Sequence, residues 1–177
     1  RDSMVTFLFA GHETTSLALT YTFLLLAQNP DVRATLDREH ETVLGGDPPS
    51  VADLPDLPYT ERVVKESLRC YPPAYALFRR ATEDVEVGGY RIRAGTKITL
   101  PQFRLHADPR FWDEPAAFRP ERWTPEMEAE LPDYAYFPFG GGPRHCIGMR
   151  FATMELSLVL STIAQRVEFD PVDDGDP

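Results

Sequence analysis

The 177-residue chain is poor in cysteine and in basic side chains. Its two cysteines, Cys70 and Cys146, stand far apart, which excludes a disulfide framework and the paired C-x-x-C ligands of a zinc site. The 18 basic side chains are outnumbered by 28 acidic ones, and the formal net charge is −10. Because no basic stripe is present, nucleic acid is not an expected partner.

Long hydrophobic runs are also missing. The most apolar stretch, residues 17–27, is too short to cross a bilayer, and His12 and Glu13 interrupt its extension towards the N-terminus. The chain begins with Arg1 and shows no signal-peptide pattern. Since two separated cysteines also suit a reducing compartment, we expect a cytoplasmic protein with no membrane segment in this chain.

The pattern along the chain predicts a mainly α-helical protein with small antiparallel β-sheets. Apolar residues on most faces of residues 3–28 predict one long helix that is central and buried. A proline in the first turn and two glycines after the last residue predict a second helix over residues 30–44. A third helix is expected over residues 59–70, where two prolines end it.

The second half of the chain holds the expected strands and a long irregular segment. Alternating residues and two glycine-containing turns predict short antiparallel strands within residues 78–100. Proline and aromatic residues without periodicity predict packed irregular structure over residues 106–139. A last helix is expected over about residues 147–166, after a glycine-rich segment.

That glycine-rich segment carries the strongest chemical signal, Phe139-Gly-Gly-Gly-Pro-Arg-His-Cys146-Ile-Gly148. Glycine has no Cβ, so the backbone can lie very close to a flat ligand. Cys146 is expected at or just before a helix N-terminus, where unpaired N–H groups favour the thiolate that ligates metals. Arg144 supplies a cation for an anionic group on the same ligand. These features together predict haem held by cysteine.

These residues allow other interpretations, which differ in the residue spacing that they require. A buried structural cysteine in a glycine-rich loop is the plainest alternative. His106 and His145 are conceivable iron ligands, but the loop pattern fits the thiolate and neither histidine. His12-Glu13 begins like a zinc peptidase H-E-x-x-H motif, yet Ser16 stands where the second histidine is needed.

The pattern F-x-x-G-x-R-x-C-x-G resembles the haem-binding loop of the cytochrome P-450 family. Its fixed positions are filled by Phe139, Gly142, Arg144, Cys146 and Gly148. The resemblance implies haem b (iron protoporphyrin IX) as cofactor, with Cys146 as the axial ligand of the iron. The neighbouring Gly140 is assigned to the same haem-binding loop.

Ala10-Gly11-His12-Glu13-Thr14-Thr15 breaks a local rule inside a helix that is otherwise apolar. Glycine and threonine weaken the helix, and a carboxylate beside a hydroxyl can relay protons. The run resembles the oxygen-activation motif A-G-x-[D/E]-T-T of the same family. The resemblance implies that Glu13 and Thr14 are catalytic and that Ala10 and Gly11 form a wall over the haem.

Glu66 and Arg69 place opposite charges on one helix face, a weak signal by itself. With Phe118-Arg-Pro-Glu-Arg122-Trp123 downstream, the pair resembles the family's E-x-x-R motif and the arginine of its meander. The resemblance implies a buried network of Glu66, Arg69 and Arg122 that locks the irregular segment supporting the cysteine loop. Trp123 stands where the family usually has Phe.

Two further residues receive weaker assignments. Family position implies that Arg79, like Arg144, binds a haem propionate. The neighbouring Arg80 is a second candidate, and an exposed strand arginine fits Arg79 equally well. Cys70 ends a helix before two prolines and is expected to be structural.

The resemblance covers nearly the whole chain and implies the C-terminal portion of the P-450 fold. Residues 1–177 then form a partial domain, from the central helix to the haem-loop helix, without the N-terminal half and the extreme C-terminus. The implied enzyme is a monooxygenase that inserts one atom of O₂ into an apolar organic substrate. Its electrons come from NAD(P)H through a separate ferredoxin or flavoprotein reductase.

The sequence leaves two alternatives open. A peroxide-using haem-thiolate enzyme would share the cysteine loop, but such enzymes typically lack the acid–threonine pair seen at Glu13-Thr14. The other alternative is a catalytically incomplete fragment that binds haem poorly or not at all.

Overall fold

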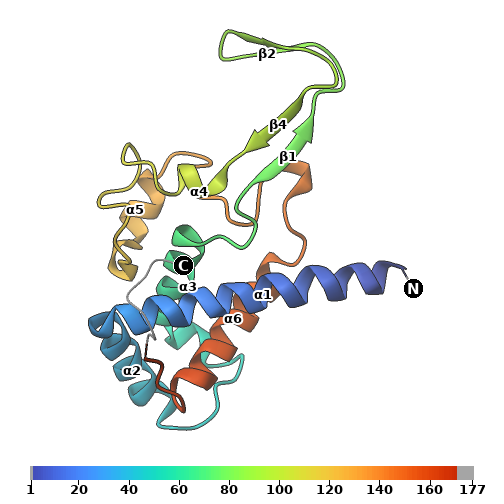
Figure 1. Ribbon diagram of the computed structural model, residues 1–177. Helices are drawn as coiled ribbons and strands as arrows, with labels where there is room; N and C mark the ends of the chain where they lie inside the picture. Colours follow the sequence, from blue (N-terminus) through green and yellow to red (C-terminus); the bar gives the residue numbers. More distant parts are fainter. Residues whose placement is uncertain (1, 171–177) are drawn as a thin grey trace.

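The computed structural model describes residues 2–170, and side chains from residue 4 onwards. A helical body carries a thin β-ribbon that projects away from it (Figure 1). The helices of the described residues are α1 (Asp2–Gln28), α2 (Pro30–Leu44), α3 (Pro58–Cys70), α4 (Gln102–Leu105), α5 (Pro125–Glu130) and α6 (Met149–Ala164). Within this part of the chain, none of the helices is both long and apolar enough to cross a membrane.

The projecting ribbon contains two antiparallel pairs of strands. β1 (Leu77–Arg80) pairs with β4 (Lys97–Leu100), and β2 (Val85–Val87) pairs with β3 (Tyr90–Ile92). The turn between β2 and β3 is made by Gly88 and Gly89, with φ of 57° and 82°. Two consecutive residues with positive φ are what a tight hairpin turn of type I′ requires, and glycine adopts them without strain. The predicted mainly α fold with small antiparallel sheets is confirmed.

The core lies where α1, α2, α3 and α6 meet. Leu36, Val63 and Leu160 are completely buried there, one from each of α2, α3 and α6. Full burial of a side chain of this size contributes roughly 1.5–3 kcal/mol to folding. The remaining core residues are Ala18, Phe23, Leu25, Leu26, Val32, Val64, Leu68, Phe118, Leu156 and Ala164.

The extent of α1 is as predicted, but its expected burial is wrong for the first half. Residues 4–14 are exposed, and Met4 and Phe9 are 76% and 72% exposed. Burial begins at Thr15, because α2, α3 and α6 pack only against the second half of α1. In Figure 1 the N-terminal end of α1 reaches away from the other helices.

The irregular segment 106–139 is packed by aromatic rings, as predicted. The centroids of Trp112 and Trp123 lie 5.5 Å apart, and those of Trp123 and Tyr136 lie 4.6 Å apart. The short helices α4 and α5 are not among the expected elements. Helices of four and six residues are too short to show a hydrophobic period, and Thr124 starts α5 by accepting a hydrogen bond from Met127 N–H (3.2 Å).

Polar contacts tie the four core helices together. The His40 Nε2 atom of α2 lies 3.0 Å from both Thr60 Oγ1 of α3 and Ser161 Oγ of α6. Desolvation lowers the pKa of the His40 imidazole, so the ring stays neutral in this contact. The Thr22 hydroxyl of α1 lies 2.7 Å from Ser67 Oγ of α3.

The N-terminus of α3 is capped by a side chain from another helix. The Glu39 carboxylate of α2 accepts hydrogen bonds from Tyr59 N–H (2.6 Å), Thr60 N–H (2.8 Å) and Thr60 Oγ1 (2.7 Å). No side chain at the start of α3 itself performs this function. A carboxylate at this position satisfies unpaired N–H groups and interacts favourably with the helix dipole.

Replacement of this cap tests its contribution. We expect Glu39→Ala to lower the free energy of unfolding by about 2 kcal/mol, because two backbone donors lose a charged acceptor. Chemical denaturation measures the change. Glu41→Ala, at an exposed position on the same helix, serves as the control and should cost about 0.5 kcal/mol or less. Equal losses in the two variants would show that the cap contributes nothing specific.

Candidate active site

The cysteine loop runs from the core to the start of α6. Phe139 packs against the core cluster, and its carbonyl accepts a hydrogen bond from Cys146 N–H (2.9 Å), which ties the two ends of the loop together. Gly140 and Gly142 have φ of 74° and 65°. Both values lie in the left-handed region, where a Cβ is costly, so the loop needs glycine at these positions.

The central glycine, Gly141, was not singled out from the sequence. A Cβ at this position would collide with the ring of Tyr134. On the neighbouring residue, a Cβ at Gly140 would lie 3.4 Å from Leu77 Cδ1, at the start of β1. The glycine run is therefore packed between Tyr134 and β1, and its three consecutive glycines were the available sign of this close approach.

Cys146 is a free, exposed cysteine three residues before α6 begins at Met149. Met149 N–H donates to the Cys146 carbonyl (3.4 Å). The expected placement just before a helix N-terminus is therefore observed, although the helix starts two residues later than expected. Ile147 and Phe151 are 87% and 63% exposed, so the thiol lies on a segment with uncovered apolar side chains.

The two arginines assigned to the haem lie on adjacent segments. Arg144 is exposed in the 3₁₀ turn η3 (Gly142–Arg144) of the loop. Arg79 is exposed on β1, the strand that contacts Gly140 through Leu77, and its Nη1 atom donates to the Phe78 carbonyl (2.9 Å). Both guanidinium groups are therefore accessible to an anionic ligand.

Residues 10–14 of the A-G-H-E-T-T motif are exposed, and Thr15 is buried. The Thr14 hydroxyl donates to the Ala10 carbonyl (2.7 Å), the backbone competition expected of threonine in a helix. Space beside Gly11 is open, since no atom outside the adjoining residues and backbone of its own helix lies within 4 Å of a Cβ built there. Thr15 Oγ1 donates to Glu155 Oε2 of α6 (3.4 Å), and Glu13 is exposed. The motif therefore contacts the helix that follows the cysteine loop.

Glu66, Arg69 and Arg122 are brought together in a buried network. Glu66 Oε1 accepts from Arg69 Nη2 (2.8 Å) and Arg122 Nε (2.9 Å), and Oε2 accepts from Arg69 Nε (2.9 Å). Two further donors, which the sequence motifs do not indicate, complete the set. Arg119 N–H donates to Oε1 (3.0 Å) and the Trp123 indole N–H donates to Oε2 (2.9 Å). Phenylalanine at position 123 could not make this last bond.

Both arginines of the network also hold the irregular segment. Arg69 Nη1 donates to the carbonyls of His106 (2.8 Å) and Pro115 (2.9 Å). Arg122 Nη1 donates to the carbonyl of Asp113 (2.8 Å). The two buried guanidinium groups thus bond to one carboxylate and to backbone oxygens. These bonds order a segment that has little regular structure.

Of the other candidate metal ligands, Cys70 is unsuitable and His106 is occupied, whereas His145 is accessible but does not fit the loop pattern. Cys70 lies beside Arg69 (Nη2 to Sγ, 3.2 Å), and desolvation raises the pKa of its thiol to about 12, so Cys70 stays a neutral thiol, in accord with a structural role. His106 is buried and accepts a backbone hydrogen bond through Nε2. His145 is exposed beside Cys146.

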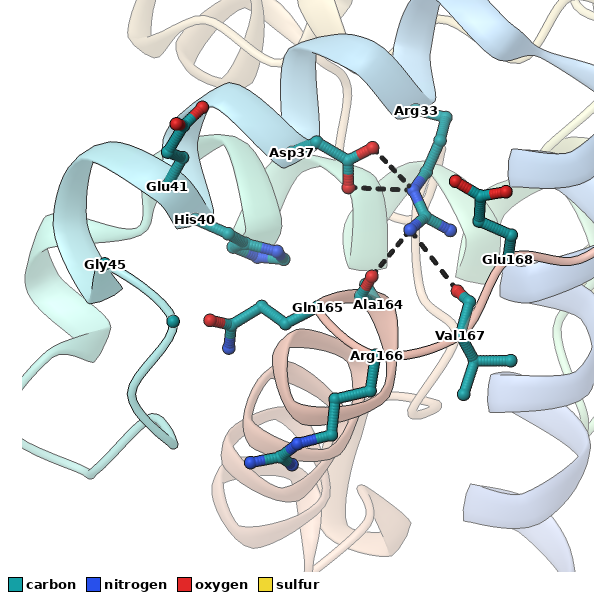
Figure 2. A pocket seen from close by; sticks show the side chains of 11 residues that line it. Arg33, Asp37, His40, Glu41, Gly45, Ala164, Gln165, Arg166, Val167 and Glu168 are labelled. Atoms are coloured by element: carbon teal, nitrogen blue, oxygen red, sulfur yellow. Dashed lines mark hydrogen bonds and ion pairs between the residues drawn. The ribbon is translucent and has the colours of Figure 1, made fainter.

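A separate hollow of about 620 Å³ lies between α2 and the C-terminal end of α6, far along α6 from the cysteine loop (Figure 2). Arg33 dominates it, with Nε bonded to both Asp37 carboxylate oxygens (2.8 and 2.9 Å) and Nη2 to the Ala164 carbonyl (2.6 Å). These contacts attach α2 to the end of α6. The hollow contains neither cysteine nor any of the predicted site residues.

The possible metal ligands of this chain fit a metal that is bound in a macrocycle, because the macrocycle itself supplies most of the ligands. Among residues 2–170, no group of three or more His, Cys, Asp or Glu side chains could hold a bare metal ion. One accessible thiol, glycines that permit a close approach and two exposed arginines suit a flat, anionic macrocycle instead. The residues present therefore fit haem held by a single thiolate.

Comparison with known proteins agrees with this class of site. A family model described as Cytochrome P450 matches residues 1–177. The chain belongs to the cytochrome P450 family, as its four motifs indicated.

Several curated relatives show how much of such a protein the chain represents. Cyclooctatin synthase of Streptomyces melanosporofaciens is 43% identical over 171 residues, which are 97% of this chain and 37% of the relative. Human cytochrome P450 4V2 is 43% identical over 92% of this chain and 31% of its own length. Human cytochrome P450 3A5 is 43% identical over 94% of this chain and 33% of its own length. The chain thus spans about a third of these relatives.

The energetic weight of the buried network can be measured directly. We expect Glu66→Gln to lower the free energy of unfolding by about 3–5 kcal/mol, because it leaves two buried guanidinium groups without a counter-charge. Trp123→Phe removes one donor of five and should cost about 1–2 kcal/mol. Urea denaturation followed by circular dichroism gives both values.

Glu61→Gln on the same helix is the matched control. Glu61 pairs with Lys65 (3.0 Å) at the surface, where such a pair is worth about 1 kcal/mol or less. If Glu66→Gln were no more harmful than Glu61→Gln, the network would not be the anchor of the irregular segment.

Proposed function

We propose that this protein is a haem-thiolate monooxygenase that inserts one atom of O₂ into an apolar organic substrate. Residues 1–177 are then the part of the domain from the central helix to the haem-loop helix. The observation that carries the proposal is the accessible, unpaired thiol of Cys146 on a loop that needs its glycines. Cys70, the other thiol, is disqualified by its raised pKa.

The residues of the loop would hold haem b in complementary ways. Cys146 would supply the sulfur that ligates the iron, and Arg144 and Arg79 would neutralise the two carboxylates of the macrocycle. Gly140, Gly142 and Gly148 keep side-chain bulk away from its face. When bound, haem supplies the O₂-activating chemistry, in which electron donation from the thiolate favours O–O cleavage.

The motif on α1 supplies the proton chemistry in this proposal. The Glu13 carboxyl is exposed and can exchange protons with water, while Thr14 holds its hydroxyl against the Ala10 carbonyl. In that arrangement the Thr14 oxygen keeps lone pairs with which to orient a neighbouring donor. Gly11 leaves room for a small molecule beside the helix, and the neighbouring Ala10 adds only a methyl group. An acid and a positioned hydroxyl are sufficient for general acid catalysis.

The electrons are proposed to come from NAD(P)H through a separate protein, a ferredoxin or a flavoprotein reductase. Within these 177 residues, two cysteines far apart cannot provide the four thiolates of an iron–sulfur cluster, so the electrons have to reach this part of the protein from outside it. Cys146 and the apolar and basic residues around it are exposed, so a partner protein can approach this loop.

The ligand assignment is tested by the difference spectrum of the reduced, haem-loaded protein with carbon monoxide. We expect the strongly red-shifted band of thiolate-ligated haem in the natural protein and in Cys70→Ser. Cys146→Ser should lose this band, because serine offers no thiolate. Retention of the band in Cys146→Ser, or its loss in Cys70→Ser, would contradict the assignment.

The proton-delivery assignment is tested by coupling, measured as product formed per NAD(P)H consumed in the protein of full natural length. We expect Glu13→Gln and Thr14→Ala to keep haem binding and to lower this ratio about tenfold or more, since positioned acids contribute 10²–10⁴-fold to proton transfer. Thr20→Ala is the control, because the Thr20 hydroxyl makes the same kind of helix bond, to the Ser16 carbonyl (2.9 Å). Unchanged coupling in Thr14→Ala would remove Thr14 from the mechanism.

A further inference from the structure

We propose that His106 and Gln102 are positioning residues that fix the start of the Cys146 loop to the Glu66 network. Neither residue belongs to the motifs that identify the haem site. The spectroscopic part of the inference rests on the proposed function, whereas its structural part can be tested without haem.

The pair clamps one peptide unit from both sides. His106 Nε2 accepts a hydrogen bond from Phe137 N–H (3.0 Å). Gln102, one helical turn earlier, donates through Nε2 to the carbonyl of the same Phe137. Both side chains are completely buried, so neither bond can be replaced by water. One turn of helix thus specifies the position of the Phe137 backbone.

Phe137 is directly linked to the loop. Its carbonyl also accepts from Gly140 N–H (2.9 Å), which makes the turn that leads into the glycine run. Two residues after Phe137, the Phe139 carbonyl accepts from Cys146 N–H (2.9 Å). A displacement of Phe137 would therefore move the residue that holds the Cys146 backbone.

The other side of the clamp is attached to the buried network. Arg69 Nη1 donates to the His106 carbonyl (2.8 Å), and the same guanidinium group bonds to both oxygens of Glu66. The connection from Glu66 to Cys146 therefore consists of short polar contacts between buried groups and the loop backbone. Geometry that several such bonds determine is what a metal-ligand loop requires.

The electrostatics keep His106 in the form that the clamp needs. Its ring must be neutral with Nε2 unprotonated, because Nε2 accepts from an N–H group. Burial, and then the charge of Arg69, lower the pKa of His106 to about 4, against the opposing effect of the Leu68 and Arg69 carbonyls. The rings of Tyr136 and Phe137 cover it, with centroids at 5.2 and 5.5 Å. The acceptor is therefore available at neutral pH.

The test compares His106→Phe with His40→Phe in the protein of full natural length. Phenylalanine at position 106 fills the space but leaves Phe137 N–H buried without an acceptor. His40 is also a completely buried histidine, yet it bonds to Thr60 and Ser161 rather than to the loop. His106→Gln restores an acceptor oxygen near the position of Nε2 and serves as the rescue variant.

The first readout is amide hydrogen exchange without haem. We expect His106→Phe to accelerate exchange at Phe137 and Cys146 about tenfold relative to the natural protein, the effect of one unsatisfied buried donor. His40→Phe should lower the unfolding midpoint but change these two amides less than about twofold, and His106→Gln should lie near the natural protein. If His106→Phe does not fold, Gln102→Leu tests the same clamp from its donor side and should accelerate the same amides.

The second readout is the carbon monoxide spectrum of the reduced, haem-loaded variants. We expect the thiolate band of His106→Phe to convert to the thiol-ligated form about tenfold faster than that of His40→Phe, because the loss of one hydrogen bond frees the loop. Equal exchange and equal conversion in these two variants would overturn the inference. If the natural protein shows no thiolate band, the proposed function fails, and the exchange data alone decide whether the clamp exists.

Discussion

The structure depends above all on the buried Glu66 carboxylate and its five donors. A charge taken out of water is costly unless all its lone pairs are satisfied, and an incomplete set of donors would be worse than an apolar core. The donors come from α3 itself and from the segment around Arg122, which are far apart in sequence. The fold of the irregular segment, residues 106–139, therefore depends on the Glu66 side chain, because this segment has no long helix or sheet whose backbone hydrogen bonds could replace the network.

This dependence explains how a proline-rich segment can support a site. Arg69 and Arg122 hold backbone carbonyls of residues 106–117, and the rings of Trp112, Trp123 and Tyr136, which meet one another in tilted and edge-on contacts, fill the space beside them. The segment also fixes the cysteine loop, because Phe137 N–H bonds to His106 and the Phe139 carbonyl accepts from Cys146 N–H. Glycine suits the backbone path of the loop, because Gly140 and Gly142 adopt positive φ values and the missing side chain of Gly141 leaves room for Tyr134.

Sequence reasoning located what local chemistry determines. The bounds of α2 follow from Pro30 and Gly45, and those of α3 from prolines at both ends, so these helices are as predicted to within a residue. The grouping of Glu66 with distant arginines needed the family motif, because no local pattern indicates it. Contacts between segments remained hidden: the Glu39 cap and the Trp123 donor depend on neighbours that only the folded chain supplies. The predicted burial of the first half of α1 was wrong for the same reason, because the apolar pattern of a helix does not show which of its faces other elements cover.

Burial divides the candidate site into two kinds of residue. Those assigned to touch haem, oxygen or substrate, such as Cys146, Arg144 and Glu13, are exposed in this structure. Those that hold them, such as Glu66 and His106, are completely buried. Substitutions of the first kind change little packing and act on chemistry, whereas those of the second kind act through the position of the loop and cost stability as well. The natural control for any variant at this site is therefore a residue of matching burial elsewhere in the chain, because burial, more than residue type, decides how much stability is lost.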